Sequence, residues 1–218
     1  MSDVLLKEFC DRLRIELRPQ LQFASEHPYH PVVVYHCPAP WQVLGTGNYA
    51  AVFIHPDFPD WVAKIYAPGR DGFAAEVDVY QRLGCHPAFS ECHHAEDGYL
   101  VLKRLDGITL YDCLHQGIAI PPQVITEVDE ALDYARQRGL TPHDVHGKNV
   151  MLSATGKGLV VDISDFLHSA PCHAWDDLKR AYAWIYQPII AKLNLKIPYI
   201  LLDQVRHLYR VWRRWAKG

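Results

Sequence analysis

Residues 139–151 read Gly139-Leu140-Thr141-Pro142-His143-Asp144-Val145-His146-Gly147-Lys148-Asn149-Val150-Met151, and their polar members decide the fold. The stretch follows a segment with helical periodicity and ends in apolar residues typical of a strand. Asn149 lies five residues after Asp144, and Asp162 lies thirteen residues after Asn149, where a second apolar strand ends. This order suits one general base and two Mg²⁺ ligands, because Mg²⁺ prefers carboxylate and amide oxygens.

A turn that contains glycine precedes this stretch in the chain. Gly45-Thr46-Gly47 lies between the apolar runs Trp41–Leu44 and Ala51–Ile54, which predict a hairpin. A hairpin turn can need glycine for its own backbone angles. Alternatively, its amides can lie over phosphates, which only glycine allows a backbone to approach closely. The pattern alone leaves both explanations open.

A lysine inside an apolar strand forms a further signal. Lys64 lies within the predicted strand Trp61–Tyr66, and Glu76 follows on a predicted helix over residues ~72–83. A lysine in a strand usually points to solvent. A lysine that holds two phosphates needs a fixed partner, however, and a carboxylate on a nearby helix can supply one.

The remaining patterns predict a strand-rich first half and a helix-rich second half, and therefore an α+β fold. An amphipathic helix is expected over residues ~3–17, where Leu5, Phe9, Leu13 and Leu17 share one face. Further strands are expected at residues 32–35 and 99–102. Further helices are expected at residues ~109–115, ~122–138, ~175–193 and ~197–216.

Together the motifs resemble those of the protein-kinase-like superfamily: a glycine loop, a strand lysine, a helix glutamate, HRDxxxxN and DFG, in that order. The resemblance extends from about Trp41 to Leu178 and includes the hinge-like phrase Tyr99–Leu110. It implies a bilobal fold, with an N-lobe over residues 1–104 that carries one regulatory helix. A shortened helical C-lobe would cover residues 105–218.

The same resemblance implies a role for each matching residue. Gly45 and Gly47 would lie over the phosphates of ATP, and Lys64 would contact the α- and β-phosphates while paired with Glu76. Asp144 would be the base or orient the hydroxyl, and Asn149 and Asp162 would bind Mg²⁺. The other residues implied at the nucleotide site are the flanking Val52 and Val62, the gatekeeper Leu102, and Lys103 to Leu105, whose backbone would contact adenine.

The chain also departs from the family pattern. Pro142-His143-Asp144 replaces HRD, so the arginine that would receive an activation-loop phosphate is absent, and His146 replaces the following lysine. Asp162-Ile163-Ser164 replaces DFG. Asp165-Phe166-Leu167 looks more like DFG, but it does not directly end the apolar strand, so we prefer Asp162. The replacement of the lysine after HRD by His146 is similar to the pattern of choline- and aminoglycoside-kinase-like relatives.

The segment after Asp162 is short. The phrase Trp175-Asp176-Asp177-Leu178 begins the next predicted helix, where the family often places an aspartate that braces the catalytic loop. No Ala-Pro-Glu follows. The brevity resembles Rio-type and other minimal bacterial and archaeal kinases. It implies an enzyme without phosphorylation-controlled loop ordering, and it removes the platform on which conventional protein kinases dock peptides.

Composition limits the class of protein. The formal net charge of −3 gives no global attraction to nucleic acid or to an anionic membrane. No export signal or membrane span is recognisable, so we expect a cytoplasmic chain with six reduced cysteines. Cys85-His86 and Cys92-His93-His94 could supply zinc ligands, but their spacing matches no common zinc finger, and an ordinary loop is the alternative.

The last predicted helix is basic, with interleaved aromatic residues. It could bind nucleic acid or an acidic partner. We prefer the alternative that Val205, Leu208, Val211 and Trp212 pack against the domain while the arginines stay solvated.

The sequence thus predicts a kinase that uses ATP and Mg²⁺ and phosphorylates protein serine or threonine hydroxyls. A small-molecule kinase is the alternative enzyme, favoured by His146 and the missing peptide platform. A pseudokinase scaffold is the alternative from another functional class.

Overall fold

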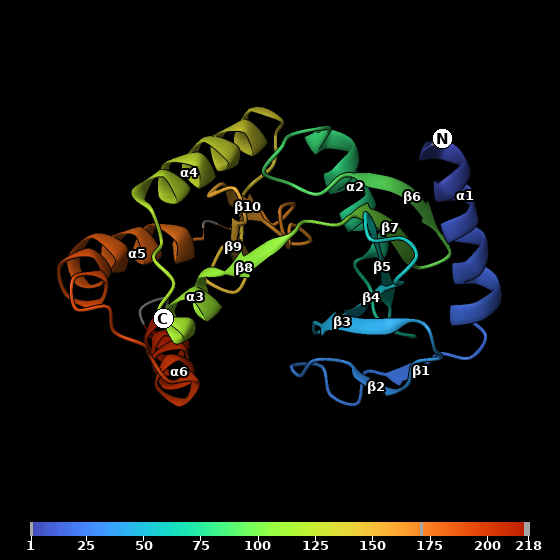
Figure 1. Cartoon of the computed structure of the whole chain (residues 1–218), viewed down its shortest axis with the longest axis horizontal. Coiled ribbons are helices and arrows are strands. Elements are labelled where there is room, and N and C mark those ends of the chain that lie inside the picture. Colours follow the sequence, from blue (N-terminus) through green and yellow to red (C-terminus); the bar gives the residue numbers. More distant parts are fainter. Residues whose placement is uncertain (1, 171, 216–218) are drawn as a thin grey trace.

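The computed structural model of the chain describes residues 2–170 and 172–215 and has the α+β composition that the sequence predicts (Figure 1). The strands are β1 Gln22–Ala24, β2 Val33–His36, β3 Gln42–Thr46, β4 Ala50–Ile54, β5 Trp61–Tyr66, β6 Cys92–Glu96, β7 Tyr99–Lys103, β8 Gly107–Thr109, β9 Val150–Ser153 and β10 Gly158–Val160. The helices are α1 Ser2–Arg12 with its π-helical continuation η1 Leu13–Leu17, α2 Phe73–Leu83, α3 Leu110–Gln116, α4 Pro122–Gln137, α5 Ala174–Ala181 with its π-helical continuation η2 Tyr182–Ala191, and α6 Tyr199–Trp215.

The largest sheet is antiparallel, with strand order β3-β4-β5-β7-β6. Alternate residues of a strand point to opposite faces, and β5 shows the consequence directly. Ala63 and Ile65 pack with α1 on one face, whereas Val62 and Tyr66 pack with α2 and the second half of the chain on the other. Lys64 shares the second face, so the sheet directs it away from α1.

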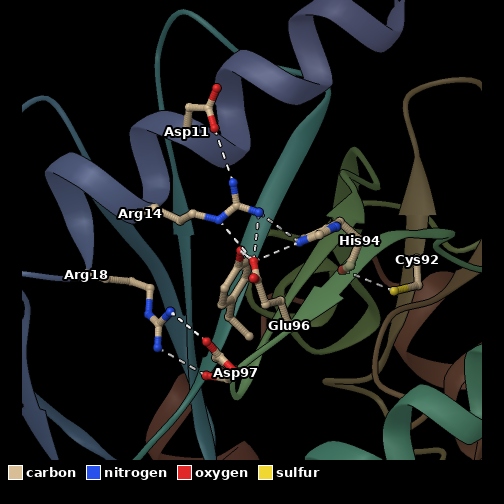
Figure 2. A network of polar contacts seen from close by, with 8 residues as sticks. Asp11, Arg14, Arg18, Cys92, His94, Glu96 and Asp97 are labelled. Atoms are coloured by element: carbon tan, nitrogen blue, oxygen red, sulfur yellow. Dashed lines mark hydrogen bonds and ion pairs between the residues drawn. The ribbon is translucent and has the colours of Figure 1, made fainter.

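The N-terminal helical segment covers the first of these faces, as its periodicity predicted. Phe9, Leu13 and Leu17 are fully buried there. Polar contacts fix the same segment at its edge: Figure 2 shows Arg14 reaching Glu96 on β6, with 2.7 Å between Nη2 and Oε2. Tyr99 also donates to that oxygen at 2.6 Å. The helix therefore closes the sheet face that the predicted site does not use.

A smaller antiparallel sheet, β10-β9-β8, lies among the helices of the second half (Figure 1). Gly107 begins β8, and the sequence had placed it in a hinge. A Cβ at this position would lie 2.7 Å from the Leu152 carbonyl oxygen. Glycine is therefore required by the close approach of two strands, and residues 104–106 connect β7 to β8.

Of the region weighed as a zinc site, Cys85-His86 lies in a loop as expected, whereas Cys92-His93-His94 lies in an edge strand with an irregular register. Cys92–Glu96 pairs with β7, so the expectation of a loop was wrong there; alternation of half-buried and exposed residues along it could have revealed the strand. Among the residues that the structure describes, no group of three histidine, cysteine or acidic side chains is placed to hold a metal ion. All six cysteines are free thiols.

The prediction for the last helix was also wrong. The apolar residues expected to pack are exposed: Val205 by 58 %, Leu208 by 66 % and Trp212 by 57 %. The helix instead uses a polar stripe, in which Tyr209 and Arg213 both bond to Asp177 of α5. Polar partners distant in the sequence thus fix its orientation.

No described helix is both long and apolar enough to cross a membrane.

Candidate functional site

Three of the predicted site residues come together around the Lys64 ammonium group. Its Nζ lies 2.8 Å from Glu76 Oε1 and 3.5 Å from Asp162 Oδ1. Lys64 lies on β5, Glu76 on α2 and Asp162 just after β10. Lys64 and Asp162 are 98 positions apart in the sequence. Burial alone would lower the pKa of Lys64, but the charges of Asp162 and Glu76 outweigh it and raise the pKa. Lys64 is therefore a permanent cation.

The Glu76 carboxylate is almost completely buried, with 1 % of its surface exposed. A buried charge is tolerated only when it is paired and hydrogen-bonded. Lys64 donates a hydrogen bond to one carboxylate oxygen, Oε1, and the Tyr66 hydroxyl donates to the other, Oε2. Sequence analysis missed Tyr66. Its position two residues after Lys64, on the same face of β5, was the available signal.

Asp162 follows β10 and keeps 46 % of its side chain exposed. Its Oδ1 accepts hydrogen bonds from the Ser164 hydroxyl at 2.9 Å and the Ser164 amide at 3.3 Å. Burial would raise the pKa of Asp162, but Lys64 and Ser164 lower it overall. No hydrogen bond among the described residues occupies Oδ2. An ionised oxygen with no protein partner suits a divalent cation.

The predicted catalytic loop adopts a tight and unusual conformation. Asp144 has φ of +54°, in the left-handed region that few residues other than glycine enter. Such conformations cluster at functional sites. The Asn149 side-chain amide nitrogen donates to the Asp144 carbonyl at 3.1 Å, which leaves the amide oxygen of Asn149 for another partner. The Asp144 side chain is 55 % exposed and so can reach an acceptor.

His146 lies beside the Asp144 carboxylate, with 3.6 Å between Nε2 and Oδ2. Its Nδ1 accepts the Lys148 backbone amide at 3.2 Å, so in the neutral ring the proton is on Nε2, which faces Asp144. Burial lowers the pKa of His146 despite the nearby charge of Asp144. At neutral pH the ring is therefore an uncharged donor rather than a cation.

Gly45 lies within β3, opposite Val52 of β4, and Gly47 lies in the turn between the two strands. Neither Gly45 nor Gly47 has a positive φ. A Cβ on Gly45 would meet nothing within 4 Å, and one on Gly47 would meet only the Ala50 carbonyl, at 3.7 Å. Positive φ therefore explains neither glycine. Gly45 lies beside a register irregularity of β3 at Val43/Gly45, where strands favour glycine, and the role of the turn over phosphates stays a prediction.

The residues expected around adenine lie on β4, β5 and β7 and in the connection after β7. Val62 and Leu102 are buried, 7 % and 5 % exposed, and Val52 is half-buried against them. The Lys103 amide already donates to the Glu91 carbonyl, and the Lys103 carbonyl accepts from the Ser90 hydroxyl. No backbone hydrogen bond of the described residues involves Leu105, so its backbone groups are open to a ligand.

Two further features concern the segment after Asp162. Burial, with the neighbouring charges of Asp162 and Asp144, raises the pKa of Asp165, so this carboxyl group lies close to the same site. The Cys172 sulfur accepts the Asp144 backbone amide at 3.4 Å, a contact that sequence analysis did not suggest. Of the two α5 aspartates, Asp177 bonds to Tyr209 of α6 and Asp176 pairs with Lys179, so among the described residues neither forms a hydrogen bond or ion pair with the loop around Asp144.

A surface hollow of about 540 Å³ lies elsewhere, lined by His115, Gln116, Lys196 and Pro198. None of these residues was predicted as part of the nucleotide site.

Known proteins similar to the chain include several serine/threonine-protein kinases. YrzF of Bacillus subtilis, named as a candidate serine/threonine-protein kinase, is 34 % identical over 171 residues, which span 77 % of this chain and 78 % of YrzF. PknI of Mycobacterium tuberculosis is 33 % identical over 137 residues, 54 % of this chain but 23 % of PknI. PknB of Mycobacterium leprae is 35 % identical over 68 residues, 29 % of this chain and 11 % of PknB. No family profile matches the chain.

Proposed function

The chain belongs to the protein-kinase-like superfamily and is an ATP-dependent phosphotransferase, and we propose that it transfers the γ-phosphate of Mg·ATP to protein serine or threonine hydroxyls. One observation carries the proposal: Lys64 contacts both Glu76, at 2.8 Å, and Asp162, at 3.5 Å. A buried lysine with two carboxylates suits a site that binds phosphates and a metal ion. The serine/threonine specificity is taken from the names of the relatives.

The donor set around Asp162 fits Mg²⁺. Asp162 Oδ2 and the amide oxygen of Asn149 are hard oxygen donors that the protein's own hydrogen bonds leave available. When bound there, Mg²⁺ would neutralise phosphate charge. Lys64 would hold the α- and β-phosphates, and Gly45 and Gly47 would lie over the phosphates. The Gly47 amide itself donates to the Ala50 carbonyl at 2.8 Å, so closeness of the glycine backbone is the feature that supports this role.

Asp144 would orient the acceptor hydroxyl and accept its proton. Its exposed carboxylate and its left-handed backbone favour this role. His146 would donate through Nε2 toward the carboxylate or an incoming phosphate oxygen without adding a full charge. Since phosphoryl transfer needs little covalent chemistry from the protein, positioning and electrostatics would supply most of the acceleration.

We propose that residues 1–104 and 105–218 are the two lobes of a kinase fold, with adenine against Val52, Val62, Leu102 and the backbone of Leu105. We also propose that the chain is a minimal, Rio-like or small bacterial or archaeal type. Residues 163–173 alone separate Asp162 from α5, which supports the absence of a regulated activation segment.

A small-molecule hydroxyl is the second candidate acceptor. The neutral His146 beside Asp144 and the short segment before α5 favour it, because little chain is present to dock a peptide. The two candidates share the nucleotide site and differ only in the acceptor.

The test is incubation of the purified protein with γ-labelled ATP and Mg²⁺, alone and with lysate, against Asp144→Asn as the matched control. Labelled phosphoserine or phosphothreonine that Asp144→Asn does not produce supports a protein kinase. Label only in a small-molecule fraction supports the second candidate. A folded wild-type chain that binds ATP and labels nothing would be a pseudokinase, and the proposal would fail.

A further inference from the structure

Tyr66 has a place in the site that the kinase motifs do not assign. It lies two residues after Lys64 on the same face of β5. Its hydroxyl donates to Glu76 Oε2, while Lys64 occupies Oε1 at 2.8 Å. The two donors thus bind different oxygens of one buried carboxylate and do not compete. Glu76 keeps a partner whether or not Lys64 moves.

The start of α2 is shaped around the Tyr66 ring, which is an independent observation. Gly72 precedes α2 with φ of +111°, and a Cβ there would lie 3.3 Å from Tyr66 Cε1. Phe73, the first residue of α2, packs edge-on against the same ring at 5.9 Å between centroids. The backbone that carries the ring is fixed as well, because the Tyr66 amide donates to the Gly98 carbonyl at 2.9 Å.

The segment after Asp162 shares the apolar core with α2 through Ile163 and Phe166 but, in the part that the structure describes, gives the helix no polar support. Among the described residues, no hydrogen bond or ion pair joins residues 163–170 or 172–173 to this helix. At its other end, α2 is held by the Tyr134 hydroxyl, which donates to the Leu83 carbonyl at 2.9 Å. Val79, Tyr80 and Leu83 pack α2 into the core, whereas the polar partners of the Glu76 carboxylate, Lys64 and Tyr66, both come from β5.

We propose that Tyr66 is a positioning residue: it holds α2 where Glu76 pairs with Lys64 and so keeps the site assembled without loop phosphorylation. The expected effect of Tyr66 on catalysis rests on the proposed function. Its effect on the position of α2 rests only on the contacts described above. Tyr66 touches neither nucleotide nor acceptor in this role. It acts through Glu76, which in turn directs the Lys64 ammonium group.

The first test compares Tyr66→Phe with Tyr182→Phe. Both tyrosines are 8 % exposed, and the Tyr182 hydroxyl donates to the Ile120 carbonyl at 2.8 Å, so each variant loses one buried hydroxyl and nothing else. We expect kcat/KM for ATP to fall about 10- to 100-fold in Tyr66→Phe, since small misplacement of a positioning group can cost about 10²-fold. Tyr182→Phe should keep unchanged turnover. Its melting midpoint should fall no more than that of Tyr66→Phe, because its hydroxyl serves a neutral carbonyl rather than a buried carboxylate. Equal turnover in the two variants would overturn the proposal.

The second test asks whether Tyr66 acts through Glu76. In a Glu76→Ala background, Tyr66→Phe should cause no further loss, because the group it positions is gone. An undiminished further loss would show that Tyr66 acts by another route, and the proposal would be wrong. Glu76→Gln provides a second background if Glu76→Ala does not fold.

A third measurement is independent of activity. Amide hydrogen exchange over Phe73–Leu83 should accelerate in Tyr66→Phe and stay at the wild-type rate in Tyr182→Phe. If the wild-type chain proves inactive, the proposed function fails while this measurement still decides the role of Tyr66. Unchanged exchange in Tyr66→Phe would refute the role even in an active kinase.

Discussion

Substitution of Gly47 by alanine should separate the stability of the free protein from its affinity for ATP. Gly47 has no positive φ, and an added Cβ would make only an ordinary contact, 3.7 Å from the Ala50 carbonyl oxygen. A Gly→Ala change at a compatible site stabilises a protein by about 0.4–1 kcal/mol, because the unfolded chain loses conformational freedom. For a chain of this size, that corresponds to a rise of about 1–4 °C in melting midpoint.

The effect on ATP should have the opposite sign. If the turn lies over the phosphates, the new methyl group takes the space through which phosphate oxygens reach the backbone amides. Loss of one hydrogen bond to a charged group costs about 1.5–3 kcal/mol. The dissociation constant for ATP should therefore rise about 10- to 150-fold. Gly45→Ala should behave in the same way, since a Cβ there meets nothing within 4 Å.

Thermal melting with and without Mg·ATP, together with titration calorimetry, measures both quantities on one sample. Gly156→Ala is the control: this glycine lies in the turn between β9 and β10 with φ of +81° and open space around it. It should lose about 1–2 kcal/mol of stability through backbone strain and keep its ATP affinity. A Gly47→Ala protein that binds Mg·ATP as tightly as the wild type would refute the phosphate-loop assignment.

Three other predictions follow from the same structure. Asp162→Asn should abolish turnover and Asp165→Asn should leave most of it, because Lys64 contacts Asp162; the reverse in a steady-state assay would show that the wrong aspartate was chosen. Phosphatase-treated protein should turn over as fast as untreated protein, and silencing by dephosphorylation would contradict the constitutive site. Hydrogen bonds from Tyr99 and Arg14 lower the pKa of Glu96 to about 2. The stability that this carboxylate contributes is therefore present above its unfolded-state pKa of about 4.3 and is lost as the pH falls toward 2. In denaturant titrations the wild type should exceed Glu96→Gln at pH 7 and approach it near pH 2, and a constant difference would contradict the pairing.

Local patterns were sufficient to predict the long elements. The spacing of Leu5, Phe9, Leu13 and Leu17 predicted the N-terminal helix; the last three are fully buried, and Leu5, in the first turns, is 42 % exposed. The predicted strand Trp61–Tyr66 has the same bounds in the structure. Both are segments in which hydrophobic periodicity and flanking turn residues agree, and such agreement makes a local prediction strong.

Contacts between distant segments could not be predicted in the same way. The alternation along β6 was hidden by histidines and a cysteine, which suggested metal ligands rather than a strand. The orientation of α6 depends on Asp177, 32 positions before Tyr209 and 36 before Arg213. Periodicity shows that a helix has two faces, but it does not show which face finds a partner.

The motif order predicted which residues would meet at the site, but not the atoms that hold them. Lys64, Glu76 and Asp162 were predicted to act together, and the structure brings their side chains into contact. Tyr66 and Ser164 were not predicted, because a supporting hydroxyl can come from any neighbouring position with suitable geometry. The roles assigned to Asp144, His146 and Asn149 stay predictions until the variants are measured.

The two carboxylates around Lys64 differ in a way that indicates how a nucleotide would enter the site. Breaking the pair with Glu76 would leave a charge with 1 % exposure supported only by the neutral Tyr66 hydroxyl, and loss of the counter-ion from a buried pair typically costs about 3–5 kcal/mol. Asp162 is 46 % exposed and keeps both hydrogen bonds from Ser164 when Lys64 leaves. Water or a cation can solvate it, so the contact at 3.5 Å is the weaker of the two. A phosphate group should therefore draw the ammonium group away from Asp162 rather than from Glu76, which frees that carboxylate for a metal ion at the moment the phosphates arrive.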